Sequence, residues 1–152
     1  MHLALINIAR AKYPLDDPRI AEFVDNLDRV NAIADRSPGF VWRLVGEGEN
    51  DATSIGAFSD PRIIVNMAVW ESMEALENFT YRTVHKHFFA RRNEWFGRLE
   101  GPHMAIWWIK EGMVPTIEDG KARLELLAEM GPTEDAFIFG TVFAPPKKKQ
   151  SA

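Results

Sequence analysis

Side chains capable of chemistry concentrate between residues 66 and 96 of this 152-residue chain, in segments that are otherwise apolar. Asn66 and Trp70 lie in the apolar run 63–70, and His85, His87 and Arg91 follow in the next segment. A polar group on a core-facing position costs free energy unless it is hydrogen bonded. An amide can donate and accept, an imidazole can exchange a proton near neutral pH, and a guanidinium can hold a phenolate or a carboxylate. The pattern predicts a pocket between a strand and the helix that follows it.

The phase of the predicted helix 72–96 decides which of these side chains point inward. On a helical wheel, His87 and Arg91 are one turn apart within an apolar arc. The arc contains Leu76, Thr80, Val84, Phe88 and Trp95. His85 points elsewhere, so a helical His-x-His pair cannot chelate one metal ion, and we expect no metal site.

These considerations define two sets of candidate residues. The candidate catalytic residues are Asn66, Trp70, Arg91, His85 and His87. The candidate substrate-binding residues are Trp42, Arg43, Phe79, Tyr81, Phe88, Trp95 and Trp107. The alternative to a ligand site is that these residues have only a structural role. Each polar group is then hydrogen bonded within the core, and the arginine guanidinium reaches solvent. The five tryptophans and ten phenylalanines leave the same choice, between a pocket for a flat aromatic ligand and a heavy core with an oligomer interface.

The elements that must position these residues follow from apolar periodicity and capping signals. Strands are expected at 2–10, 40–45, 63–70 and 103–110, and helices at 18–36, 72–96 and 116–130. Asp17, Ser72 and Thr116 are the expected N-caps. A long loop is expected at 46–61 and a short edge strand at 136–143. The order β-α-β-β-α-β predicts an α+β, ferredoxin-like antiparallel sheet with two helices on one face, plus a C-terminal helix. Residues 1–144 form one predicted domain.

The faces of the sheet predict the assembly. Residues 63–70 and 104–109 are largely apolar on both alternating sides, although two helices cover only one face. An exposed apolar face of that size usually marks an interface. We therefore expect a homodimer in which two sheets pack face to face. The alternative is that the third helix covers this face within one chain.

Composition excludes several classes of function. A formal net charge of −4 argues against nucleic-acid binding, and the basic run 147–149 is expected to belong to a disordered tail, 145–152. The absence of cysteine excludes disulfides and thiolate chemistry. No run approaches the roughly 20 apolar residues of a membrane span, and the first residues are typical of a strand, not a signal peptide. The acidic segment 46–49 would repel phosphate. We expect a cytoplasmic protein.

Several segments together resemble a family of small bacterial proteins of unassigned function. They are residues 66–79, Tyr81, His85, the segment 91–96, the segment 105–108, and the stretches 115–116 and 131–137. The resemblance covers most of the chain. That family is similar to the antibiotic-biosynthesis monooxygenases of the dimeric α/β-barrel superfamily, which implies a ferredoxin-like dimer.

The resemblance also implies a chemistry. The related monooxygenases oxidise polycyclic phenols with molecular oxygen and without a cofactor. They use an Asn and a Trp on a strand and an Arg from the following helix, and Asn66, Trp70 and Arg91 look similar to that set. The family's histidine matches His85, whereas the wheel turns His87 inward, so both stay candidates.

Two classes of function remain open from the sequence. The first is an enzyme, a cofactor-independent monooxygenase acting on an aromatic or polyketide-like substrate. The second is a non-catalytic dimer that binds a small aromatic ligand or has a structural role. A haem-binding relative is a variant of the first class; otherwise no cofactor is expected.

Overall fold

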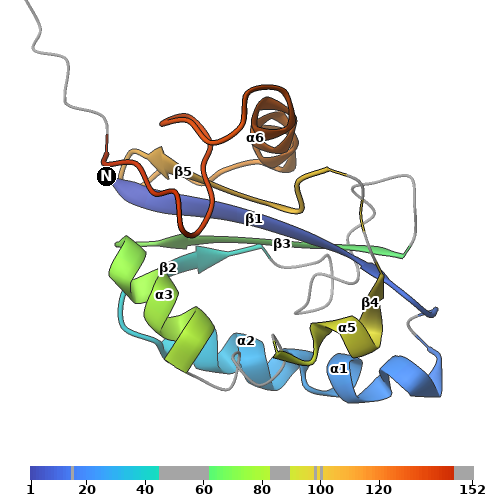
Figure 1. Ribbon diagram of the computed structural model, residues 1–152. Helices are drawn as coiled ribbons and strands as arrows, with labels where there is room; N and C mark the ends of the chain where they lie inside the picture. The colour runs from blue at the N-terminus through green and yellow to red at the C-terminus, as the bar shows by residue number, and fades with distance from the viewer. Residues whose placement is uncertain (15, 45–61, 83–89, 98, 100, 146–152) are drawn as a thin grey trace, which may run out of the picture.

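The computed structural model describes residues 1–14, 16–44, 62–82, 90–97, 99 and 101–145. An antiparallel sheet runs through the middle of the molecule, with helices on both of its faces (Figure 1). Its strands are β1 (His2–Ala11), β2 (Phe40–Arg43), β3 (Ile63–Trp70), β4 (Phe96–Gly97) and β5 (Met104–Ile109). β3 lies between β2 and β1, and the other edge of β1 pairs with β5 and then with β4. This is the predicted ferredoxin-like arrangement.

One face of the sheet carries the layer of helices that precede β5 in the chain. They are η1 (Pro18–Ile20), α1 (Ala21–Asp25), α2 (Leu27–Arg36), α3 (Met73–Arg82) and α5 (Arg92–Trp95). The Asp17 side chain accepts a hydrogen bond from the Arg19 N–H at 2.8 Å, as expected of the N-cap. The predicted helix 18–36 is interrupted at Asn26, whose amide donates to the Glu22 carbonyl at 2.7 Å.

The predicted helix 72–96 differs most from the structure. It begins as expected, because the Ser72 hydroxyl accepts from the Ala75 N–H at 3.1 Å. α3 is described as far as Arg82, and residues 83–89 lie outside the described part of the chain. Arg91 has φ −98° and ψ 9° ahead of the short helix α5, and Phe96 belongs to β4, where it pairs with Ala11. Tertiary pairing with the end of β1 therefore overrides the helical pattern at the end of this segment.

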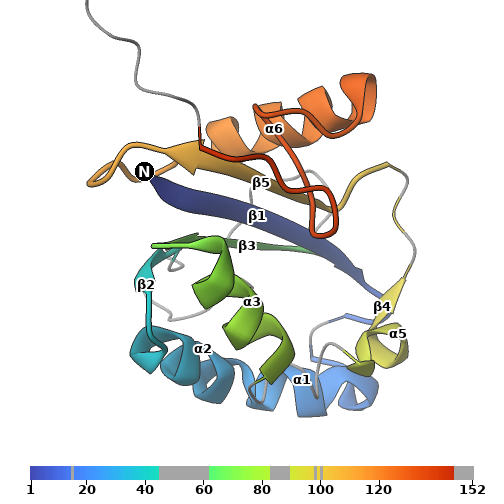
Figure 2. The same cartoon turned by 60° about the vertical axis from the view of Figure 1, so that its left-hand side comes forward.

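α6 (Ile117–Met130) lies on the opposite face of the sheet, as Figures 1 and 2 both show. A capping box opens it: the Asp119 N–H donates to the Thr116 hydroxyl, and the Thr116 N–H donates to the Asp119 carboxylate. Leu124 and Leu127 of α6 pack into a cluster with sheet residues of this face, namely Ala4, Ile6, Ile8, Val65, Met67, Val69, Ala105 and Trp107. All of these residues are buried within the single chain.

This arrangement corrects the prediction of an open sheet face. The alternative, in which the third helix covers that face, is the one that the structure shows. Face-to-face packing of two sheets therefore loses its physical basis here, because the apolar side chains it would bury are already buried. Homodimerisation itself remains a prediction, which a measurement of molecular mass in solution would test.

The chain after α6 runs along the free edge of β5. Ile106 and Phe137 exchange two backbone hydrogen bonds of 2.8 and 2.9 Å, and the Trp108 indole donates to the Phe143 carbonyl at 2.8 Å. The predicted edge strand 136–143 is thus present only as isolated bridges.

The predicted loop 46–61 and residues 146–152 of the predicted tail lie outside the described residues. In the described part of the chain, no helix is both long and apolar enough to cross a membrane.

Candidate functional site

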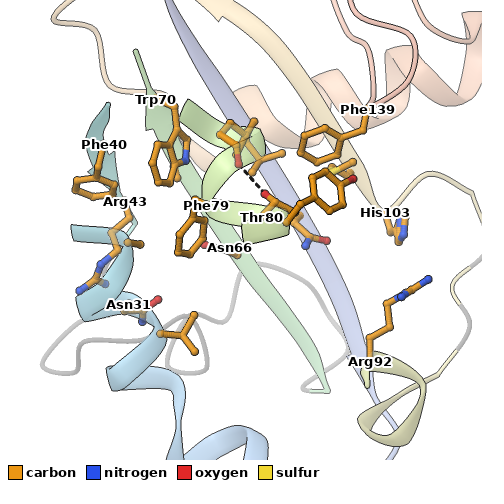
Figure 3. A pocket seen from close by; sticks show the side chains of 18 residues that line it. Asn31, Phe40, Arg43, Asn66, Trp70, Phe79, Thr80, Arg92, His103 and Phe139 are labelled. Atoms are coloured by element: carbon orange, nitrogen blue, oxygen red, sulfur yellow. Dashed lines mark hydrogen bonds between the residues drawn. The ribbon is translucent and has the colours of Figure 1, made fainter. Parts of the chain in front are cut away.

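A cavity of about 300 Å³ lies between the sheet and the helices α2 and α3 (Figure 3). Strand alternation turns Leu5 and Asn7 of β1, and Asn66, Ala68 and Trp70 of β3, toward it. Its volume is at the lower end of the range typical of small-molecule sites, about 300–1,000 Å³. The cavity lies where the sequence places a pocket, between the third strand and the following helix, and its use as a binding site remains a prediction.

Two asparagines form the polar part of its floor. Asn7 and Asn66 are directly opposite each other in the β1–β3 register. Asn66 is exposed and Asn7 is half-buried. Within the part of the chain that the structure describes, neither side chain amide makes a hydrogen bond. Because opposite side chains on a sheet are neighbours, the two amides offer adjacent donors and acceptors to a molecule in the cavity.

Aromatic rings form the wall beside this floor. Trp70 stacks on Phe79 of α3 at 5.2 Å between ring centroids, and Phe40 of β2 meets Trp70 edge-on at 5.6 Å. Tyr81 makes an edge contact with Phe139 of the C-terminal segment at 5.5 Å. Trp70 is only 1% exposed, so it forms the back of the wall, and the half-buried Phe79 presents its ring to the space in front.

Two polar residues that line the cavity are already satisfied by the protein itself. The Arg43 guanidinium donates to both oxygens of Asp35, at 2.8 and 3.3 Å, and its side chain is 9% exposed. The Thr80 hydroxyl donates to the Leu76 carbonyl one turn earlier, at 2.9 Å. Arg43 therefore fastens β2 to α2, and neither group is a good candidate for holding a ligand.

The cavity is also lined by polar residues that the sequence analysis did not select. Asn31 of α2, Arg92 of α5 and His103, which precedes β5, all line it. In Figure 3 the Arg92 side chain extends from α5 toward His103. Asn7 on the cavity floor was missed as well, although the sequence contains a signal for it. It is a polar residue in an apolar strand, and a ferredoxin-like order places that strand beside residues 63–70.

Arg91 does not line this cavity, contrary to the prediction. Its guanidinium donates to Glu22 at 2.6 and 2.7 Å and to Glu94 at 2.6 and 3.0 Å, and it lies 4.8 Å from the centre of the Trp95 ring. The hydrogen bonds to Glu22, and then those to Glu94, raise the Arg91 pKa further above its ordinary value. Arg91 thus joins α1 to α5. The helical wheel misplaced it because Arg91 itself is not helical.

Other predicted site residues lie elsewhere or outside the described chain. Trp95 is buried against Phe23, with ring centroids 5.7 Å apart. Trp107 lies in the cluster beneath α6, and Trp42 packs against the same cluster. His85, His87 and Phe88 fall among residues 83–89, outside the described part. Among the described residues, no three His, Asp or Glu side chains are grouped so that they could hold a metal ion.

Several solved structures are similar to this chain. A protein of unknown function from Nitrosomonas europaea matches with 13% identity and a TM-score of 0.51, over 76% of this chain and 95% of that one. A conserved protein from Methanosarcina mazei matches with 13% identity and a TM-score of 0.52, over 72% and 94%. SnoaB, a cofactor-independent oxygenase from Streptomyces nogalater, matches with 15% identity and a TM-score of 0.50, over 74% and 96%.

At these identities the likeness establishes the fold, which is the one that the sequence predicts. The curated proteins contain no match to this chain. The model of one protein family, described as a domain of unknown function (DUF3291), matches residues 2–152. Since this match extends over nearly the whole chain, the protein belongs to the DUF3291 family.

Proposed function

We propose that the protein binds a small, flat, oxygen-bearing aromatic molecule in the cavity between the sheet and α3. The observation that carries the proposal is the amide pair Asn7–Asn66, set in an otherwise apolar sheet face in front of the Phe79 ring. A purely structural pair of asparagines would be expected to hydrogen bond within the protein, because unsatisfied amides are costly in a filled core. Here both amides face a cavity.

The arrangement suits a ring with an oxygen substituent. The ring would lie against Phe79 and Tyr81, where aromatic contacts add to the burial of apolar area. The oxygen would accept from the Asn7 and Asn66 amides. Arg92, which also lines the cavity, supplies positive charge that would stabilise a phenolate or carboxylate.

Binding of 1-hydroxy-2-naphthoate, followed by quenching of tryptophan fluorescence, tests the proposal. We expect saturable binding, and we expect Asn66→Ala to weaken it by about tenfold, the loss of one hydrogen bond. The control is Asn26→Ala, which removes an amide that bonds within the helical layer and does not line the cavity. Equal affinities of the two variants, or no saturable binding to the wild type, would contradict the proposal.

The neighbouring arginines provide a second, sharper comparison. Arg92→Ala should weaken 1-hydroxy-2-naphthoate several-fold and leave the neutral 1-naphthol almost unaffected, because only the anion needs the charge. Arg91→Ala should change neither affinity, because Arg91 is bonded to Glu22 and Glu94 outside the cavity. The reverse result would restore the assignment of Arg91 that the sequence favoured.

Cofactor-independent oxygenation is the second candidate function. It is supported by Asn66 on the cavity floor, Trp70 in the wall, and a fold shared with a cofactor-independent oxygenase. In such a reaction a ring methylene becomes a carbonyl, one oxygen atom of O₂ enters the product, and the other leaves as water. The substrate supplies all four electrons. The amides would hold the substrate oxygen, and Arg92 would stabilise the enolate or phenolate that reacts with O₂.

Oxygen uptake with anthrone, in chelator-treated buffer without flavin, tests this second candidate. We expect one O₂ consumed per anthraquinone formed, and loss of this activity in Asn66→Ala. Our candidates for the proton acceptor are His103, which lines the cavity, and the histidines His85 and His87 chosen from the sequence. The alanine variant of the acceptor should slow turnover by roughly 10²- to 10⁴-fold. Tight binding of naphthoate without turnover of anthrone would favour the non-catalytic ligand-binding protein.

A further inference from the structure

A second hollow, of about 490 Å³, continues from the first along the same face of the sheet. The two share six lining residues, so they meet at a common waist: Asn7, Val30, Asn31, Asn66, Arg92 and His103. Five of these six side chains are polar. The polar groups described above are therefore not at the end of a site but in the middle of a longer one.

The two compartments differ in their walls. The first is rich in aromatic rings, contributed by Phe40, Trp70, Phe79, Tyr81 and Phe139. Outside the six shared residues, the second is mainly aliphatic. Its lining includes Ala9 of β1, Leu27 of α2 and Ile64 of β3, with Phe23 and Phe96, and also Leu44 and Leu99, which pack against the cluster beneath α6 as well. A flat ring makes its most favourable aromatic contacts in the first compartment, whereas a flexible hydrocarbon chain fits the second.

The length of the site agrees with a two-part occupant. Leu5 lines the first compartment and Ala9 lines the second, with Asn7 between them on the same face of β1. At about 3.3 Å per residue, Leu5 and Ala9 are roughly 13 Å apart. A two-ring molecule in the first compartment would leave the second one empty.

We propose that the two compartments hold one elongated ligand with an aromatic head, an oxygen-bearing junction at the polar waist, and an aliphatic tail. This inference rests on the proposed binding function and specifies its ligand class. The tail lies along Ala9 and Ile64. Its transfer out of water increases the affinity of the ligand, by an amount set by the apolar area that the tail buries.

Two alanines allow each compartment to be closed separately. Ala68 is beside Leu5 in the register and lies on the aromatic side of the Asn7–Asn66 pair. Ala9 is opposite Ile64 and lies on the aliphatic side. Ala68→Leu should fill the head compartment and Ala9→Leu the tail compartment, with the same added volume on the same face of the sheet.

The experiment compares the methyl and hexyl esters of 1-hydroxy-2-naphthoic acid as probes, by fluorescence quenching. The hexyl ester should bind the wild type roughly thirtyfold or more tightly, about half of the full transfer free energy of five methylenes. Ala9→Leu should remove this advantage and leave the affinity for the methyl ester within about twofold. Ala68→Leu should weaken both esters. Thermal melts establish that each variant is folded, and Leu27→Phe closes the tail compartment from the helix side if Ala9→Leu does not fold.

The outcomes separate this inference from the function on which it rests. If the methyl ester binds and the hexyl ester binds no better, the tail site is disproved and the aromatic site stands. If the hexyl advantage survives both Ala9→Leu and Leu27→Phe, the tail lies elsewhere and the inference fails. If neither ester binds the wild type, the proposed function fails together with it.

Discussion

The two faces of the sheet are built from alternate residues of the same strands, yet one is filled and the other is hollow. On the α6 side, Ala4, Ile6 and Ile8 follow one another along β1 within one continuous apolar cluster. On the other side the apolar packing is split. Leu3 and Leu5 belong to one cluster and Ala11 to another, and the gap between them is occupied by Asn7 and Ala9.

The helices approach the two faces in different ways. α6 lies so close to the sheet that a Cβ added at Gly120 would be 2.5 Å from Cδ1 of Ile6. The helical layer on the other face is supported at its two ends instead. Trp70, Leu76 and Ala34 pack at one end, and Ile20, Ile64 and Trp95 at the other. A site can therefore remain open in the middle because stability is supplied by the opposite face and by these two end clusters.

Neighbouring residues of β3 test this division most directly. Met67 is fully buried on the filled face, and Asn66 is exposed on the hollow one. Met67→Ala should lower the free energy of unfolding by about 2–5 kcal/mol, because it leaves a void in a packed core. Asn66→Ala should change it by less than about 0.5 kcal/mol, although it weakens ligand binding. Urea denaturation of both variants measures the two effects. Comparable losses of stability would mean that Asn66 is part of a packed core.

Glycines at two turns test how tightly α3 packs at one end of the hollow face. Gly39, between α2 and β2, has φ +84°, and a Cβ there would be 2.4 Å from the Ala75 Cβ of α3. Gly112 has the same φ, and a Cβ there would meet nothing within 4 Å. Gly39→Ala should cost about 2–4 kcal/mol, from left-handed strain and overpacking, and Gly112→Ala only about 1–2 kcal/mol from the strain. Denaturation midpoints that fall by equal amounts would show that α3 is free to move away from Gly39.

Much of the fold could be predicted because its signals are local. The limits of β3 follow from its apolar run, and the caps at Asp17 and Thr116 follow from residue type and spacing. The side of the sheet that α6 covers could not be predicted. The sequence shows an amphipathic helix and an apolar face, but it does not show whether the face is covered by this helix or by a second chain.

The candidate site was predicted in part for the same reason. Asn66, Trp70 and Phe79 follow from strand and helix phase close to a reliable cap, and all three line the cavity. Arg91 was chosen instead of Arg92 because the wheel carried one helical phase through to residue 96. A break in the helix shifts that phase, and a shift of one residue changes which arginine faces inward. Asn31 and His103 come from distant elements and are brought to the site only by the tertiary fold.

The smallest predicted effect concerns the start of the helical layer on the hollow side. The Arg19 side chain, together with its backbone N–H, bonds to the Asp17 carboxylate and lowers the Asp17 pKa from 3.8 to about 2. Because this folded-state pKa lies below the unfolded one, the stabilisation is present above pH 4 and is lost as the pH falls toward 2. Asn also caps helices well, so Asp17→Asn removes the charge and keeps the cap.

We expect the melting temperature of the wild type to exceed that of Asp17→Asn at pH 6, and the difference to shrink between pH 4 and pH 2. Added salt should reduce it as well, because the pair is at the surface. A difference that is constant from pH 6 to pH 2 would contradict the assignment. Asp17 does not line either compartment, so the affinity for 1-hydroxy-2-naphthoate at pH 6 should be unchanged in this variant. Stability at the entrance to the helical layer and binding in its centre would then be separable properties, as the comparison of the two faces requires.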